Sequence, residues 1–239
     1  MIIDMNYGPK IVTSGLVLCL DAANKNSYPG SGAVWYDLAQ NLIFNSQGTQ
    51  TPFTTKNGAA CFDFNGSGYW LCSSGYSNVD LGGDCTVIFW FYSETLSVRR
   101  TIFEKAGTTY SSYQQEIAVT WETDNTFSYY SRQSPDYDYA GILSPSTNGA
   151  WNMMSLKMST GKTTTARTGF YSKNGAPWTS YYNSRSNTAL VAAGAISVGN
   201  GYAGTVTDGF IGSVLCYNKM LSDTEILQNF NATRNRFGI

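Results

Sequence analysis

Short runs of apolar, aromatic and β-branched residues recur along almost the whole chain, roughly every 8–12 residues, with turn-forming residues between them. Gly15–Ala22, Cys85–Tyr92 and Ala195–Gly199 are three such runs. This spacing is typical of a β-sandwich or barrel. A chain of 239 residues can form one all-β domain, and it contains no linker and no repeat of fixed period. We therefore expect a single antiparallel sandwich.

The chain ends in a different pattern. The apolar run Phe210–Tyr217 leads into Ser222 and Glu225, which are spaced as a capping box that satisfies two backbone donors at the start of a helix. Leu221 and Ile226 flank this box at the positions of a hydrophobic staple. A last strand that runs into one short helix is expected.

A family resemblance follows from five segments taken in chain order. They are Gly15–Leu38, Ala59–Leu71, Trp151–Met158, Thr168–Gly175 and the tail Asn218–Ile226. The second indicates two strands around an Asn–Gly turn, and the fourth indicates a hairpin. Together they resemble the laminin-G-like, or concanavalin A-like, jelly roll found in structural proteins of tailed bacteriophages. The resemblance spans residues 15–239 and implies an all-β antiparallel sandwich with one short C-terminal helix, preceded by an N-terminal arm at 1–14.

Charge and hydropathy exclude several classes of partner. The formal net charge is −1 and the basic residues are scattered, so nucleic-acid binding is not expected. No apolar run approaches the ~18 residues of a membrane span, and the N-terminus has no signal-peptide pattern. The five cysteines lie in apolar runs without a CxxC motif, which predicts small buried side chains. One disulfide is the alternative.

Catalytic chemistry has little support. The chain has no histidine, which removes Ser–His and Cys–His nucleophiles, and it has no phosphate-binding glycine loop. Glycoside hydrolysis needs two carboxylates about 5–9.5 Å apart. Among Glu116, Glu122 and Asp124, the first two share strand parity but lie about 20 Å apart along a strand. No enzymatic activity is therefore expected.

Calcium is the one cofactor that the sequence suggests. Asp136 and Asp138 form a close acidic pair in an expected loop, and Asp208, before the last strand, would join them. Ordinary turn-capping by these acids is the competing interpretation.

Aromatic residues in the expected loops suggest a binding surface, because tyrosine and tryptophan stack on sugar rings and are enriched in protein interfaces. The tryptophans Trp35, Trp90, Trp121 and Trp151 lie in expected strands and are assigned to the core. The candidate residues for glycan or partner binding are Tyr110, Tyr113, Tyr137, Tyr139, Trp178, Tyr181, Tyr182 and Asn183.

The leading hypothesis from the resemblance is a non-enzymatic virion protein, made in the host cytoplasm, that decorates a capsid, neck, tail or fibre by docking onto other virion proteins. The alternative is a carbohydrate-binding module that recognises cell-surface glycans, and a glycoside hydrolase ranks third. A homo-oligomer is compatible with the first two; nucleic-acid and membrane partners are not expected.

Overall fold

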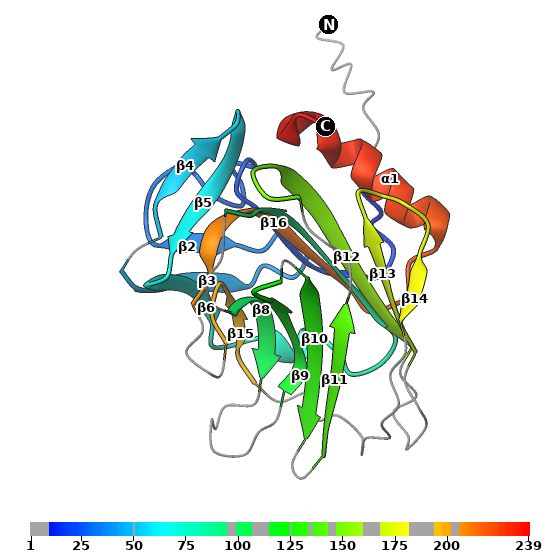
Figure 1. Cartoon of the computed structure of the whole chain (residues 1–239). Coiled ribbons are helices and arrows are strands. Elements are labelled where there is room, and N and C mark those ends of the chain that lie inside the picture. The colour runs from blue at the N-terminus through cyan, green and yellow to red at the C-terminus, as the bar shows by residue number, and fades with distance from the viewer. Residues whose placement is uncertain are drawn as a thin grey trace, which may run out of the picture.

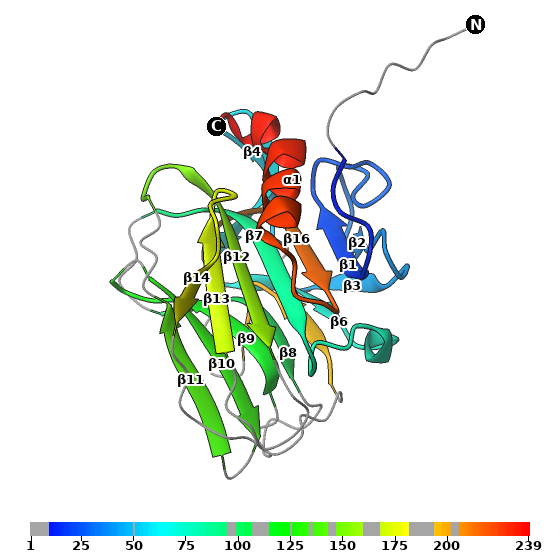
Figure 2. The same cartoon turned by 90° about the vertical axis from the view of Figure 1, so that its right-hand side faces the viewer.

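Two antiparallel sheets stacked face to face form the protein in the computed structural model, which describes residues 10–49, 51–94, 99–106, 115–124, 126–133, 136–142, 147–159, 168–181, 194–201 and 206–239. Figures 1 and 2 show the two layers, with helix α1 (Asp223–Thr233) lying across one of them. The predicted antiparallel β-sandwich with one short C-terminal helix is confirmed. No helix in the described part of the chain is long and apolar enough to cross a membrane.

The sheet beneath the helix, sheet A, has the strand order β14-β13-β12-β7-β16-β5-β4, and β1 also pairs with β16. Its strands are β1 (Leu16–Asp21), β4 (Phe53–Lys56), β5 (Ala59–Asn65), β7 (Cys85–Tyr92), β12 (Trp151–Ser159), β13 (Thr168–Lys173), β14 (Thr179–Tyr181) and β16 (Asp208–Tyr217). All eight residues of the central strand β7 are buried, because its two faces pack on different cores.

The second sheet, sheet B, has the order β11-β10-β9-β8-β15-β6-β3-β2. Its strands are β2 (Val34–Tyr36), β3 (Ile43–Gly48), β6 (Gly68–Cys72), β8 (Arg100–Ala106), β9 (Gln115–Trp121), β10 (Phe127–Gln133), β11 (Asp136–Ile142) and β15 (Ile196–Val198). Two short 3₁₀ turns, Tyr76–Asn78 and Arg234–Phe237, complete the described elements.

The main core fills the space between the sheets, and it is rich in aromatic rings. Trp35, Phe62 and Trp70 contact one another, with ring centroids 4.7–5.9 Å apart. Trp121 packs edge-on to Phe91 at 4.8 Å. The five cysteines are all buried, as predicted, and all are free thiols.

A second core lies between sheet A and the C-terminal segment. The Trp90 ring stacks on Phe237 at 4.1 Å with an interplanar angle of 9°, and Trp151 contacts the same ring. The assignment of Trp35, Trp90, Trp121 and Trp151 to the core is confirmed. Because the helix and Phe237 cover this side, much of the outer face of sheet A is not open to solvent.

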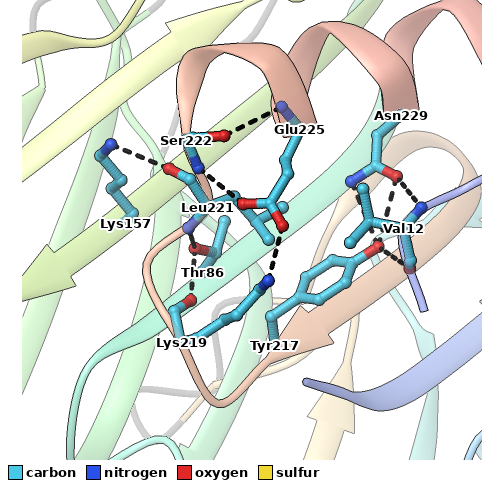
Figure 3. A network of polar contacts seen from close by, with 9 residues as sticks. All are labelled: Val12, Thr86, Lys157, Tyr217, Lys219, Leu221, Ser222, Glu225 and Asn229. Atoms are coloured by element: carbon cyan, nitrogen blue, oxygen red, sulfur yellow. Dashed lines mark hydrogen bonds and ion pairs between the residues drawn. The ribbon is translucent and has the colours of Figure 1, made fainter. Parts of the chain in front are cut away.

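The predicted capping box forms at the start of α1, as Figure 3 shows. The Ser222 hydroxyl accepts from the Glu225 amide at 3.2 Å, and the Glu225 carboxylate accepts from the Ser222 amide at 2.9 Å. Thr86 on β7 bonds the backbone of the strand–helix connection, accepting from the Leu221 amide at 3.0 Å and donating to the Lys219 carbonyl at 2.8 Å. The helix start is therefore tied to the centre of sheet A.

The buried side-chain amide of Asn229 holds the segment before β1 against the helix (Figure 3). The Asn229 Oδ1 accepts from the Val12 amide at 2.8 Å, and its Nδ2 donates to the Tyr217 hydroxyl at 3.1 Å. That hydroxyl donates to the Val12 carbonyl at 2.9 Å. The end of the predicted N-terminal arm is thus packed on the domain, while residues 1–9 lie outside the described residues.

Two expected turns have different outcomes. Asn174 and Gly175 both have positive φ, 51° and 71°, and they connect the paired strands β13 and β14 as the predicted hairpin. The two strands around the Asn65–Gly66 turn do form, but β5 belongs to sheet A and β6 to sheet B. That turn therefore carries the chain from one layer to the other.

Candidate binding face on sheet B

The members of the predicted aromatic site that the structure describes lie on strands of different sheets or beside the helix. Tyr110, Tyr113, Tyr182 and Asn183 lie outside the described residues. Tyr137 and Tyr139, expected in a loop, lie on β11 at an edge of sheet B, whereas Tyr181 ends β14 at an edge of sheet A.

Trp178 is a packing residue near the helix. It is partly buried against the second core, and the Lys157 ammonium lies 4.5 Å from its ring centroid. Its backbone amide donates to Asp223 at the helix start at 2.9 Å. Burial lowers the pKa of Lys157, whose ammonium also donates to the Leu221 carbonyl at 2.9 Å. Because Trp178 is held in this way, it is a poor platform for a sugar ring.

The three aspartates proposed for calcium are also separated. Asp136 and Asp138 lie on β11, not in a loop, and Asp136 pairs with the last residue of β10. Asp208 begins β16 in sheet A and lies 3.9 Å from Arg100, at the end of sheet B where β10 begins. The length of β10, about 20 Å for six residue steps, therefore separates them. Within the described part of the chain, no group of three His, Cys, Asp or Glu side chains could hold a metal.

Two of the three acids considered for catalysis stabilise turns. Glu122 accepts from Arg99 at 2.6 Å and from the Thr120 hydroxyl at 2.7 Å. Asp124 accepts from the side chain and backbone of Thr126, and these hydrogen bonds hold the pKa of its carboxyl below the usual value. Both acids therefore stabilise the connection between β9 and β10.

The outer face of sheet B, the side away from sheet A, is the surface that the sequence reasoning missed. Alternate residues of each strand enter the main core, so the residues between them point outward. The described outward positions include Val34, Tyr36, Ile43, Asn45, Gln47, Tyr69, Leu71, Thr101, Glu104, Ala118, Thr120, Ser128 and Ser197. We call this set the sheet B face.

One cross-strand row crosses this face. Asn45 pairs with Leu71, Leu71 with Ser197, Ser197 with Glu104, and Glu104 with Ala118. The short strand β15 makes the row possible, because Ser197 joins β6 to β8. Tyr130 and Tyr139 occupy the next two ladder positions, so β11 continues the same row.

The two halves of the sheet B face differ in exposure. Tyr36 is 42% exposed and its ladder partner Ile43 is 50% exposed. On β8, by contrast, Thr101 is buried and Glu104 is only 3% exposed. The accessible aromatic and apolar area at β2 and β3 is therefore separated from the buried polar groups of β8 by β6 and β15. Which residues share this face depends on the register of the strand pairing. The local sequence signal for an outward position is the acidic Glu104 that follows the apolar Phe103.

The segment that follows β15 lies directly on the buried half. A Cβ added to Gly201 would come within 2.7 Å of Glu104 Oε2 and 2.3 Å of Thr101 Oγ1, so only glycine allows this approach. The Ser197 hydroxyl donates to the Asn200 carbonyl at 2.6 Å, which places Asn200 beside the outward-pointing Ser197. The buried Asn200 Oδ1 has no hydrogen-bond partner in the described structure.

Comparisons with known proteins identify the fold. No family model matches the sequence, and no curated protein matches it. Domain 4 of AbnA, a GH43 extracellular arabinanase from Geobacillus stearothermophilus solved with arabinotriose, aligns with a TM-score of 0.66 at 12% identity, over 90% of this chain and 98% of that chain.

Two larger proteins contain a similar unit. The binding domain of botulinum neurotoxin DC in complex with SialylT aligns with a TM-score of 0.61 at 11% identity, over 92% of this chain and 52% of that one. Trypanosoma rangeli sialidase in complex with sialic acid aligns with a TM-score of 0.59 at 14% identity, over 94% and 34%. This chain therefore spans about half of the toxin domain and a third of the sialidase chain. The likeness shows a β-sandwich jelly-roll fold, and the virion role stays a prediction.

Proposed function

We propose that this protein is a carbohydrate-binding module whose ligand lies on the sheet B face. The observation that carries the proposal is the exposed Tyr36 on β2, which shares the sheet B face with Asn45 and Gln47 on β3 and Tyr69 on β6. Aromatic rings stack on the apolar faces of sugars, and amide groups fix hydroxyl positions. The three similar structures, solved with arabinotriose, SialylT and sialic acid, also support glycan recognition.

The outer face of sheet A is less suitable for binding a glycan. On sheet A, the helix and Phe237 cover the centre of the outer face, and Trp178 packs beside the helix. A ligand there would have to displace these contacts.

A glycan array followed by calorimetric titration of the best ligand tests this proposal. Tyr36→Ala and Tyr69→Ala are each expected to weaken binding at least about fivefold, because a buried aromatic anchor contributes more than ~1 kcal/mol. Leu227→Ala, which removes an exposed side chain on α1, and Trp178→Ala are the controls and should keep the wild-type affinity. An array with no bound glycan, or equal losses in the controls, would contradict the proposal.

A glycoside hydrolase is a second candidate, because a sialidase and a domain of a GH43 arabinanase are among the similar structures. Release of reducing ends from a bound oligosaccharide would support hydrolysis; an intact oligosaccharide would exclude it for that substrate.

The virion role is a third candidate, motivated by the phage-type tail and by apolar Tyr36, Leu38 and Ile43, which are exposed together and suit protein contacts. Mass spectrometry of purified phage particles tests it, and absence of the chain from the particles would contradict it.

A further inference from the structure

We propose that the sheet B face binds an extended, uncharged oligosaccharide along a diagonal line of three side chains, Tyr36, Asn45 and Tyr69, rather than a single terminal sugar. This inference rests on the proposed function, and it adds the length of the glycan and its direction across the strands.

The pairing of β2, β3 and β6 sets this line. Strand β3 lies between the other two. Tyr36 pairs with Ile43 and Tyr69 pairs with Gln47, so the two tyrosines are level with positions four residues apart on β3. Asn45 lies midway between Ile43 and Gln47 on β3 and points to the same side of the sheet. Tyr36, Asn45 and Tyr69 therefore follow one diagonal across three neighbouring strands.

The length of this diagonal decides the size of the ligand. At about 4.8 Å between strands and about 3.3 Å per residue, two strand spacings and four residue steps place the backbones of Tyr36 and Tyr69 about 16 Å apart. An aromatic side chain stacks on the apolar face of one sugar ring. A monosaccharide can therefore contact only one of the two tyrosines, whereas a chain of several sugars can contact both.

The diagonal is accessible along its length. Tyr36 and Asn45 are exposed, and Tyr69 is half-buried, so each has surface that a ligand can contact. The two rings offer stacking surfaces at the ends, and the Asn45 amide in the middle can both donate to and accept from hydroxyl groups. An aromatic ring, an amide and a second aromatic ring in a row match the alternation of ring faces and hydroxyl groups along a sugar chain.

The charge of this part of the face favours uncharged sugars. The outward positions of β2, β3 and β6 are all described, and none carries a charged side chain; they are Val34, Tyr36, Ile43, Asn45, Gln47, Tyr69 and Leu71. Stacking and hydrogen bonds therefore supply the affinity at these positions, and ion pairs do not. Such binding should depend little on salt, because screening weakens interactions between charges.

The test measures affinity against the length of the glycan by calorimetric titration of the full chain. The probes are arabino-, cello- and malto-oligosaccharides, together with graded fragments of the tightest glycan from the array. The monosaccharide is expected to bind at least about tenfold more weakly than a chain long enough to contact both tyrosines, and further sugars should add less than about twofold. Raising NaCl from about 50 mM to about 500 mM should change the affinity by less than about twofold.

Three variants test the diagonal itself. Tyr36→Ala and Tyr69→Ala should each lower the advantage of the long chain over the monosaccharide at least about fivefold, because each leaves one ring contact. Asn45→Ala should weaken binding of the long chain about threefold or more, since it removes a hydrogen-bonding group from the middle of the site. A residue that only supports the fold would not change the dependence on length.

Asn235→Ala is the control for the amide, because Asn235 is exposed in the 3₁₀ turn beyond α1; it should keep the wild-type affinity at every length. A monosaccharide that binds as tightly as the longest chain, an unchanged dependence on length in Tyr36→Ala, or a larger effect of salt overturns this inference and leaves the proposed function standing. No glycan binding, on the array or in any series, overturns both. Should Tyr69→Ala fail to fold by circular dichroism, the exposed positions Tyr36 and Asn45 decide.

Discussion

Asn229 is the residue on which the docking of the N-terminal segment and the helix depends, and its replacement makes a quantitative prediction. It is fully buried and bonds both the Val12 amide and the Tyr217 hydroxyl. Asn229→Ala leaves the Val12 amide without its acceptor in a dry site, which costs about 1–3 kcal/mol. The lost packing adds to this, so we expect about 2–4 kcal/mol in total.

Urea unfolding measures the effect. The midpoint should fall while the slope stays constant, because the folded area is unchanged. For a chain of this size the melting temperature should drop by about 5–12 °C. The control is Gln228→Ala, whose side chain also bonds the N-terminal segment, at Lys10 with a distance of 2.8 Å, but is exposed. It should change stability by less than about 0.5 kcal/mol. Equal effects of the two variants would refute the role of burial.

Three further predictions concern other parts of the fold. Burial raises the pKa of Cys19 and of Cys61 to about 12, so in the native protein at pH 8 neither thiol should react with a disulfide reagent within minutes, whereas urea should release all five. Burial, followed by the charges of Glu94 and Asp208, raises the pKa of Asp63 above 3.8. The ionised form therefore destabilises the fold above this pKa, so Asp63→Asn should raise the melting temperature at pH 7, and the gain should vanish below about pH 3.8. Ser222→Ala should cost about 0.5–2 kcal/mol in urea unfolding through loss of the helix cap, and a variant as stable as wild type would contradict the capping box.

Local sequence patterns predict the elements whose structure depends on neighbouring residues alone. The Ser222–Glu225 box predicts the start of α1, and Asn174–Gly175 predicts a turn with two positive φ angles. The Asn65–Gly66 turn shows the limit of such signals, because turn chemistry fixes a reversal but not which sheet receives the next strand. That choice depends on pairing with β3 and β15, which are distant in the sequence.

The candidate site was harder to predict for the same reason. Glu104 and Ser197 become neighbours only through the register of β15 with β8, and no spacing in the sequence reveals it. Tyr137 and Tyr139 read as loop residues because aspartates and a proline surround them, yet they pair with β10. Trp178 follows a glycine turn and resembles an exposed aromatic, but the helix packs beside it.

The most direct test of the central claim is a crystal structure of the chain with the tightest ligand from the glycan array. The account predicts that the sugar lies on the sheet B face, with a ring against Tyr36 or Tyr69. A sugar bound beside α1, at the edge of sheet A near Tyr181, or in any place that leaves the sheet B face empty would contradict it.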